Sequence, residues 1–269
     1  MKNDELRRYP FFGAITALAL AFLYVPLLIV AVYSFNADRS ITVWGGFSLD
    51  WYVKALTNPQ LQVAAMNSLI VAVAAATVAT LFAFMAALVL VRMRSRRSVG
   101  VAFALINLPL AVPEIVTAIG TLLFFVLIGL PLGLTSIILA HVVFCIPFAY
   151  LPLAARLQGI EVAFEEAAAD LYATRWETLR HVLIPLMMPG LISGFMLAFI
   201  VSIDDFIITS FVAGPGATTL PLAIYGMVRV GFTPEINAIA TMMLALSSLT
   251  VLASFVFARR GGSKQTLGH

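Results

Sequence analysis

Charged side chains are scarce in this sequence. Asp, Glu, Lys and Arg make up 11% of its 269 residues, whereas 62% are hydrophobic and the mean hydropathy is +1.03. A soluble domain of this length carries about 25% charged residues. The shortage excludes an ordinary water-soluble core and predicts an integral membrane protein. The formal net charge of +3 is then explained by basic residues along one membrane face, so we expect no nucleic-acid partner.

Cysteine and histidine are also scarce, and common catalytic motifs are missing from the sequence. Cys145 is the single cysteine and the three histidines are isolated, so we expect no disulfide framework and no metal site. His141 is expected to be a packed or hydrogen-bonded core residue, and His181 a surface residue. The sequence contains neither a Gly-x-x-x-x-Gly-Lys-[Ser/Thr] phosphate loop nor a Ser–His–Asp arrangement. It therefore predicts no catalytic residue and no cofactor in this chain.

Long apolar runs are what the sequence has instead. A membrane-spanning helix needs about 20 mainly apolar residues, and six runs qualify: residues 11–35, 64–91, 101–128, 134–154, 191–212 and 238–257. The first run is too long for a signal-peptide core, so we interpret it as an uncleaved span. A membrane barrel would show short alternating strands. The prediction is an all-α integral membrane protein, with six transmembrane helices in a single domain over residues 1–269.

The basic residues indicate the orientation. All but three of the 16 Lys and Arg residues fall on the side of the N-terminus, and the exceptions are Arg39, Lys54 and Arg229. Lys and Arg concentrate on the cytoplasmic side of membrane proteins, so both termini are expected to be cytoplasmic. On the outer side, residues 36–63 are expected to hold a short interfacial helix, as a partner surface or as an aromatic belt. Residues 213–237 are expected to form a re-entrant segment.

Residues 155–188 form an amphipathic, charged segment between two apolar runs. Apolar residues from Phe164 to Leu171 recur at helical spacing, which predicts a short helix. Thr174 and Glu177 have the spacing of a capping box, so a second helix is expected to begin there, and Pro185 is expected to end or kink it. The acidic residues argue against adhesion to an anionic membrane. We therefore interpret the segment as a docking site for a protein rather than as an unpartnered surface linker.

This segment carries a family resemblance. Glu166-Ala167-Ala168, followed by Ala173 and by Ile184-Pro185, resembles the "EAA" loop of the permease subunits of ABC importers. Four further segments resemble the spermidine/putrescine branch of that family: YSFN at 33–36, SIDD at 202–205, GPGATTLP at 214–221 and PEINA at 234–238. The resemblance covers nearly the whole chain. The loop motif is specific for the superfamily, and the other segments are moderately specific for the branch.

The resemblance implies a place in a larger assembly. In this family the loop forms coupling helices that dock onto a cytoplasmic ATPase. The expected partners are a second homologous permease subunit, two ATPase subunits that hold ATP and magnesium, a periplasmic substrate-binding protein and the bilayer of the bacterial inner membrane. We assign ATPase coupling to the following residues of the loop: Glu165, Glu166, Ala167, Ala168, Tyr172, Ala173, Thr174, Glu177 and Pro185.

Tyr172 departs from the family pattern, which has glycine at this position. Glycine tolerates positive φ, whereas another residue held there costs about 1 kcal/mol or more. We expect either that the turn takes another conformation or that Tyr172 adds a contact.

Acidic residues inside the predicted spans are the second informative feature. Glu114, Asp204 and Asp205 lie there without a Lys or Arg in any span to pair with them. Such a residue costs about 2.5–3.5 kcal/mol near the bilayer centre, so it normally faces a cavity or a partner. Unpaired carboxylates along a water-filled path favour a cationic substrate; alternatively, these acids cap broken helices. Adjacent helical residues diverge by about 100°, so we expect Asp204 to face the path and Asp205 a neighbouring helix or polar pocket.

The sequence thus predicts a permease subunit that moves a cationic polyamine by alternating access. The first alternative is an ABC importer for another nutrient, such as an opine or an iron complex. The second is a secondary transporter, although the six spans show no inverted half-repeat. The third, a membrane scaffold without transport activity, leaves the acids inside the spans unexplained.

Overall fold

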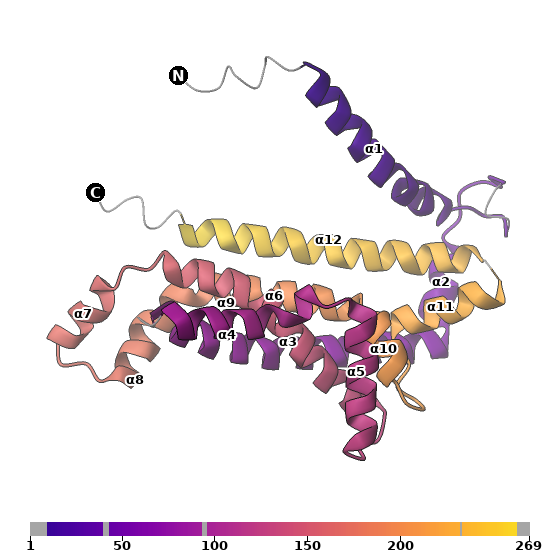
Figure 1. Cartoon of the computed structure of the whole chain (residues 1–269). Helices are drawn as coiled ribbons and strands as arrows, with labels where there is room; N and C mark the ends of the chain where they lie inside the picture. Colours follow the sequence, from indigo (N-terminus) through magenta and orange to yellow (C-terminus); the bar gives the residue numbers. More distant parts are fainter. Residues whose placement is uncertain (1–9, 40–42, 93–95, 232, 263–269) are drawn as a thin grey trace. The chain divides into compact units, whose positions relative to one another are not determined.

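A computed structural model describes residues 10–39, 43–92, 96–231 and 233–262 (Figure 1). These residues are mainly helical, and the one β-bridge among them joins Asn36 to Phe47. The all-α class is thereby confirmed. Within the described residues five helices are long and apolar enough to cross a membrane, and one bent pair makes a sixth span if it counts as one. The predicted cytoplasmic termini, residues 1–9 and 263–269, lie outside the described residues.

The helices follow the predicted spans closely at four places and less closely at two. Four predicted spans each correspond to a single helix: α1 (Pro10–Tyr33), α3 (Pro59–Arg92), α6 (Leu134–Gln158) and α12 (Pro234–Gly262). The third span is divided into α4 (Arg96–Ala111) and α5 (Glu114–Leu127), and the fifth into α9 (Ile184–Ile203) and α10 (Ile207–Val212). Short helices occupy the connections: α2 (Asp50–Thr57), α7 (Ala163–Asp170), α8 (Arg175–Thr178) and α11 (Leu220–Val230). Helices α2 and α11 lie in residues 36–63 and 213–237, the two segments that were expected on the outer side with local structure.

Backbone contacts divide the chain into two compact units, of which the first consists of Met1–Pro59 and Ile224–Ala245. In this unit the fully buried Asn36 organises the turn after α1. Its Nδ2 donates to the carbonyl of Val43 and its Oδ1 accepts from the N–H of Gly45, each at 2.7 Å. Its own carbonyl accepts from Trp51 Nε1 at 2.9 Å. These bonds tie the outer segment to α2, and they give the YSFN motif a structural role.

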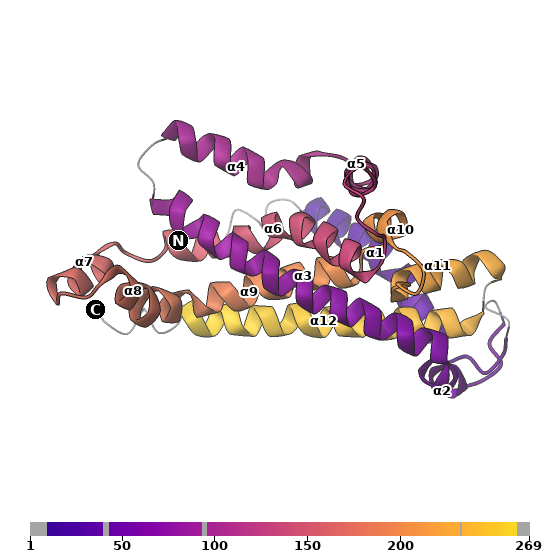
Figure 2. The ribbon, with the colours of Figure 1, turned by 90° about the horizontal axis from the view of Figure 1, so that it is seen from below.

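The second unit consists of Gln60–Ala223 and Leu246–His269. In it α3, α6 and α9 run side by side (Figure 1, Figure 2). Ala75, Ala79 and Ala83 of α3 are fully buried at intervals of four residues, which places them on one helix face. Small residues let membrane helices approach closely. Gly194 serves the same purpose on α9, because a Cβ atom there would lie 2.8 Å from the carbonyl oxygen of Ala149 on α6.

Candidate functional site

The third predicted span is broken at Val112–Pro113, where α4 and α5 are bent by 102°. Pro113 has no N–H to continue α4, and the residue before a proline avoids the α conformation. The Pro113 carbonyl instead accepts backbone N–H groups from the first turn of α5. Glu114 is the first residue of α5, where a negative charge is favoured by the helix dipole. Pro109, four residues before Pro113, lies within α4.

The fifth predicted span is broken as well, between Ile203 and Ile207. Asp205 lies inside this break and is buried. Its Oδ1 accepts from the N–H of Ile208 at 3.3 Å, and its Oδ2 accepts from the N–H and the hydroxyl of Thr209 at 2.9 and 2.8 Å. The carboxylate therefore satisfies the free N–H groups at the start of α10, as an N-cap does. The span predicted over residues 191–212 is therefore divided at this break, and Asp205 takes the alternative role in which an acid caps a broken helix.

His141, from the middle of α6, joins this break. Its Nε2 lies 3.2 Å from Asp205 Oδ2, and both side chains are 1% exposed. The same nitrogen lies 3.0 Å from Thr209 Oγ1, and Nδ1 lies 2.8 Å from Ser202 Oγ. His141 is thus the hydrogen-bonded core residue that we expected. The spans were expected to hold no Lys or Arg to pair with their acids, and Asp205 lies against a histidine instead. The signal for this histidine in the sequence was a polar residue within the fourth predicted span.

The three acids lie in different surroundings. Glu114, half-buried, is the first residue of α5, and α5 packs against α10, which begins just after Asp205, so the two helix breaks lie close together. Asp204 is exposed and accepts from the hydroxyl of Ser247 at 3.0 Å. Asp204 therefore keeps accessible carboxylate oxygens, whereas those of Asp205 face the protein, as the angular divergence predicts.

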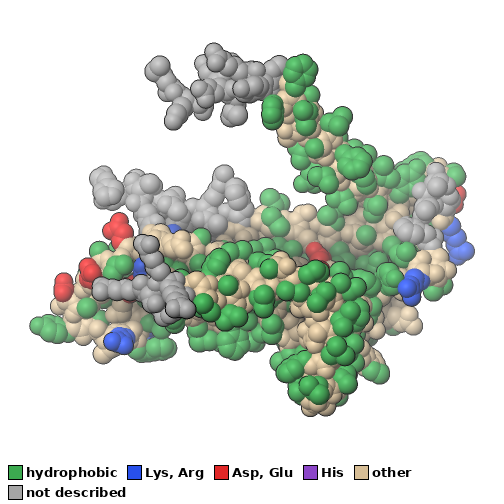
Figure 3. Space-filling model, in the orientation of Figure 1, with side chains coloured by type: hydrophobic (Ala, Val, Ile, Leu, Met, Phe, Trp, Pro, Cys, Tyr) green, Lys and Arg blue, Asp and Glu red, His purple; other side chains and the backbone are tan. Residues whose placement is uncertain are grey.

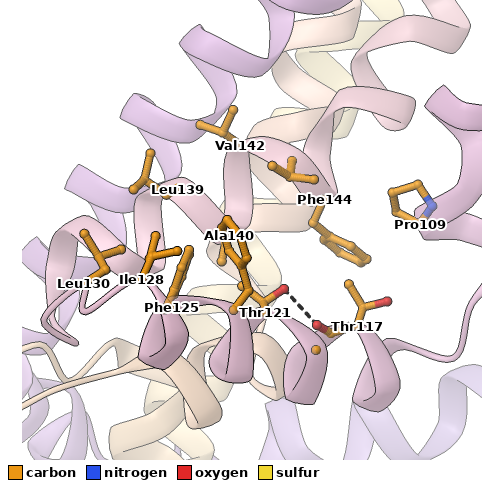
Figure 4. Close-up of a pocket in the computed structure, with 13 residues that line it drawn as sticks. Pro109, Thr117, Thr121, Phe125, Ile128, Leu130, Leu139, Ala140, Val142 and Phe144 are labelled. Atoms are coloured by element: carbon orange, nitrogen blue, oxygen red, sulfur yellow. Dashed lines mark hydrogen bonds between the residues drawn. The ribbon is translucent and has the colours of Figure 1, made fainter.

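A cavity of about 600 Å³ lies beside the first break, between α5 and α6 (Figure 4). Pro109 lies at one end of it and Leu130 at the other. Its lining residues carry no charge, and the Thr121 hydroxyl donates to the carbonyl of Thr117 at 2.8 Å. A cation moved into such a cavity loses its hydration without a compensating group. The acids, and not this cavity, therefore mark the candidate site for a cation.

The expected docking loop is a helix–turn–helix, as predicted, but it is shorter than residues 155–188. Residues 155–158 belong to α6 and residues 184–188 to α9. Helix α7 ends in a Schellman motif, in which the N–H of Tyr172 donates to the carbonyl of Ala169 and that of Ala173 to Ala168. Tyr172 takes the left-handed conformation that this motif needs, with φ of 62°. The alternative in which the turn changes conformation is therefore wrong. The Tyr172 side chain is 94% exposed.

The loop is attached to the end of α3 through Arg92. Its Nη2 lies 2.8 Å from Glu165 Oε1 and donates to the carbonyl of Ile160 at 3.1 Å. Glu166, the next residue, is exposed. In Figure 3 the acidic and basic side chains gather over α7 and α8, whereas apolar side chains cover much of the neighbouring helices. The sequence assigned Arg92 only to the cytoplasmic charge, and nothing local in the sequence indicated its contact with Glu165.

The second helix of the loop begins at the predicted capping box. Thr174 Oγ1 accepts from the N–H of Glu177 at 3.3 Å, and Glu177 Oε2 accepts from the N–H of Thr174 at 2.7 Å. The helix does not end at Pro185, because a π-helical turn (Leu179–Leu183) precedes it and α9 continues through it. The wider turn accommodates the proline, which has no N–H to donate. The prediction that Pro185 ends this helix is therefore wrong.

Three comparisons with known proteins agree with this architecture. Residues 79–260 match the family described as binding-protein-dependent transport system inner membrane component. The chain is 42% identical over 247 residues to the spermidine/putrescine transport system permease protein PotC of Escherichia coli (strain K12), covering 92% of this chain and 93% of that protein. It is also 42% identical over 267 residues to the putrescine transport system permease protein PotI of the same strain, covering 96% and 95%.

Solved structures show the same fold at lower identity. The crystal structure of a bacterial ABC transporter involved in the import of the acidic polysaccharide alginate matches with a TM-score of 0.65 and 18% identity, covering 93% of this chain and 96% of that one. An inward-facing MetNI methionine ABC transporter matches with a TM-score of 0.63 and 20% identity, covering 76% and 99%.

Proposed function

The chain belongs to the family of binding-protein-dependent transport system inner membrane components, and we propose that it is a permease subunit of an ABC importer for spermidine or putrescine. The observation that carries this proposal is the 42% identity to PotC and PotI, each over more than nine-tenths of the chain. The chain is a multi-pass protein of the inner membrane. Its relatives are transport subunits and not enzymes.

Spermidine and putrescine are cationic, and the acids at the two helix breaks fit such a substrate. We propose that the polyamine passes Glu114, Asp204 and Asp205, and that an ammonium group meets Asp204 first. Asp204 is exposed, whereas the oxygens of Asp205 accept hydrogen bonds from α10. Irregular backbone is tolerated in a membrane where it lines a cavity, and both breaks supply such backbone next to these acids.

The proposed assembly contains a second homologous permease, two ATPase subunits and a periplasmic binding protein. ATP and magnesium belong to the ATPases. The whole chain forms one permease domain with both ends in the cytoplasm. ATPase closure moves the docking loop, and the two permeases then alternate between outward and inward access. Glu166 and Tyr172 support this role for the loop. Glu166 lies on α7 and Tyr172 follows α7, and both side chains are exposed.

The remaining docking residues of the proposal support the shape of the loop. Thr174 and Glu177 start the second helix through their reciprocal hydrogen bonds. Ala167, Ala168 and Ala173 keep the first helix and its turn compact, and Pro185 joins the loop helix to α9 without ending it. Glu165 contributes through its ion pair with Arg92.

The test is uptake of labelled spermidine and putrescine by right-side-out vesicles that contain the whole transporter. We expect uptake that needs both ATP and the binding protein and that excess opine or iron complex does not compete with. Competition by one of those nutrients would favour the alternative importer. Uptake driven by an ion gradient without ATP, together with purification free of any ATPase, would favour a secondary transporter.

A further inference from the structure

His141 connects the elements on both sides of the second helix break. Ser202, on its Nδ1 side, lies in the last turn of α9, and Thr209, on its Nε2 side, lies in the first turn of α10. One buried imidazole from α6 therefore holds the end of one half-helix and the beginning of the next. The peptide between them carries Asp204 and Asp205.

The hydrogen bonds define which atoms donate. The Thr209 hydroxyl donates to Asp205 Oδ2, so its lone pairs are left to accept from His141 Nε2–H. The Nδ1 atom of the neutral ring then accepts from the Ser202 hydroxyl, since a neutral imidazole has one donor and one acceptor. In this arrangement Nε2–H also faces Asp205 at 3.2 Å. Every polar atom of the ring has a partner.

Asp205 has little capacity left for a substrate. A carboxylate offers about four lone-pair sites, and Asp205 already accepts from two backbone N–H groups and one hydroxyl while facing His141 and Glu114. Its burial also keeps an ammonium group away. Asp204, by contrast, is exposed, and Ser247 donates to only one of its oxygens, Oδ2.

Asp204 and Asp205 are joined by one peptide unit, so holding Asp205 and the backbone of the break in place also fixes the direction of the Asp204 Cα–Cβ bond, and Ser247 donates to its carboxylate. We propose that His141 is a positioning residue for import: through the contacts of its Nε2 with Asp205 and Thr209 it holds the α9–α10 break so that the Asp204 carboxylate stays directed toward the ammonium group of the substrate. This inference rests on the polyamine-permease function proposed above. It assigns substrate contact to Asp204, and it assigns maintenance of the break to His141 and Asp205.

Two substitutions of His141 separate its two nitrogens. A glutamine side chain places its NH₂ group near the position of Nε2, whereas asparagine places a polar atom near the position of Nδ1 and does not reach Asp205. In vesicles with the whole transporter, we expect H141N to raise the KM for spermidine about tenfold. H141Q should stay within about threefold of the unaltered KM. A tenfold change corresponds to about 1.4 kcal/mol.

Two neighbouring residues of α10 give a matched pair. Thr209→Val keeps the side-chain shape and removes the hydroxyl that lies between His141 and Asp205, so it should also raise KM. Ser210 is exposed and donates to the carbonyl of Ile207 within its own helix, so Ser210→Ala should leave KM unchanged. The amount of permease in the membrane is measured for each variant.

The outcomes distinguish the inference from the function on which it rests. An equal rise in KM for H141N and H141Q, or a loss of Vmax alone at unchanged KM, would show that His141 only packs the core, and the inference would be overturned. If H141N does not reach the membrane, the KM of Thr209→Val decides. A raised KM supports the inference, and an unaltered KM overturns it. If the unaltered transporter takes up no polyamine, the proposed function fails and the inference fails with it.

Discussion

The contact between Arg92 and Glu165 allows a quantitative test of how the docking loop is attached. The two side chains are 25% and 28% exposed and meet at 2.8 Å. Fully exposed ion pairs contribute about 0.2–1 kcal/mol, and salt screens a partly buried pair much less than an exposed one. For a pair that is mostly shielded from water we therefore expect about 1–2 kcal/mol. Glu165→Arg removes this contribution and places two cations side by side.

The expected result is a loop that leaves its position at the end of α3 in a large fraction of molecules. Since 1.4 kcal/mol is a factor of ten, the equilibrium constant for holding the loop at the end of α3 should fall about tenfold in Glu165→Arg, and substrate-stimulated ATP hydrolysis by the whole transporter should fall with it. The double variant with Arg92→Glu restores an ion pair and should recover much of the loss. Recovery stays incomplete, because Arg92 also donates to the carbonyl of Ile160 and a glutamate there cannot.

The matched comparison is Glu166→Gln, next to Glu165 and exposed. It should lower coupling, and adding Arg92→Glu should not restore it, because Glu166 is proposed to meet the ATPase. If the double reversal of Arg92 and Glu165 is as defective as the sum of the two single changes, the ion pair does not attach the loop and the reasoning is refuted.

Three further predictions concern the stability of the purified transporter, followed by thermal unfolding. Tyr172→Gly should relieve about 1 kcal/mol of strain at a φ of 62°, and a loss of stability would contradict the Schellman turn. Gly194→Ala should cost about 1–3 kcal/mol, because its Cβ would lie 2.8 Å from a backbone oxygen; Gly120→Ala, with open space around it, should cost nothing. Thr174→Val should lower stability by about 1 kcal/mol through the lost cap and should weaken ATPase coupling, whereas Thr174→Ser should preserve both.

Local signals in the sequence predict a large part of the fold. Apolar runs of sufficient length predict the spanning helices, and the Thr174–Glu177 spacing predicts the restart of the loop helix, because both depend on residues within a few positions of one another. The rule for Pro185 is local as well, and one of its two alternatives, that the helix ends there, is wrong. The N–H of Ile184 donates to the carbonyl of Leu179, five residues back, and this π-helical turn has no clear signature in the sequence.

The candidate site depends on contacts between distant parts of the chain, and the sequence predicts it less completely. Glu114, Asp204 and Asp205 are conspicuous because acids are costly inside a span. The sequence does not show that these acids lie together, because Glu114 and Asp205 come close only when two broken helices meet. Asp205 within an apolar run was a signal for the second break, since Asp is a preferred N-cap residue. His141 was identified as a core residue, but its partners could only come from the packing of α6 against α9 and α10.

The most direct test of the proposed function is the KM for ATP-dependent spermidine uptake by the whole transporter with Asp204→Asn and with Glu114→Gln. Both changes keep the size of the side chain and remove a carboxylate from the proposed path. We expect KM to rise about tenfold or more for Asp204→Asn and by a smaller factor for Glu114→Gln, because Glu114 is half-buried whereas Asp204 is exposed. If both variants take up spermidine with an unaltered KM, a cation does not pass these acids and the proposed path is wrong.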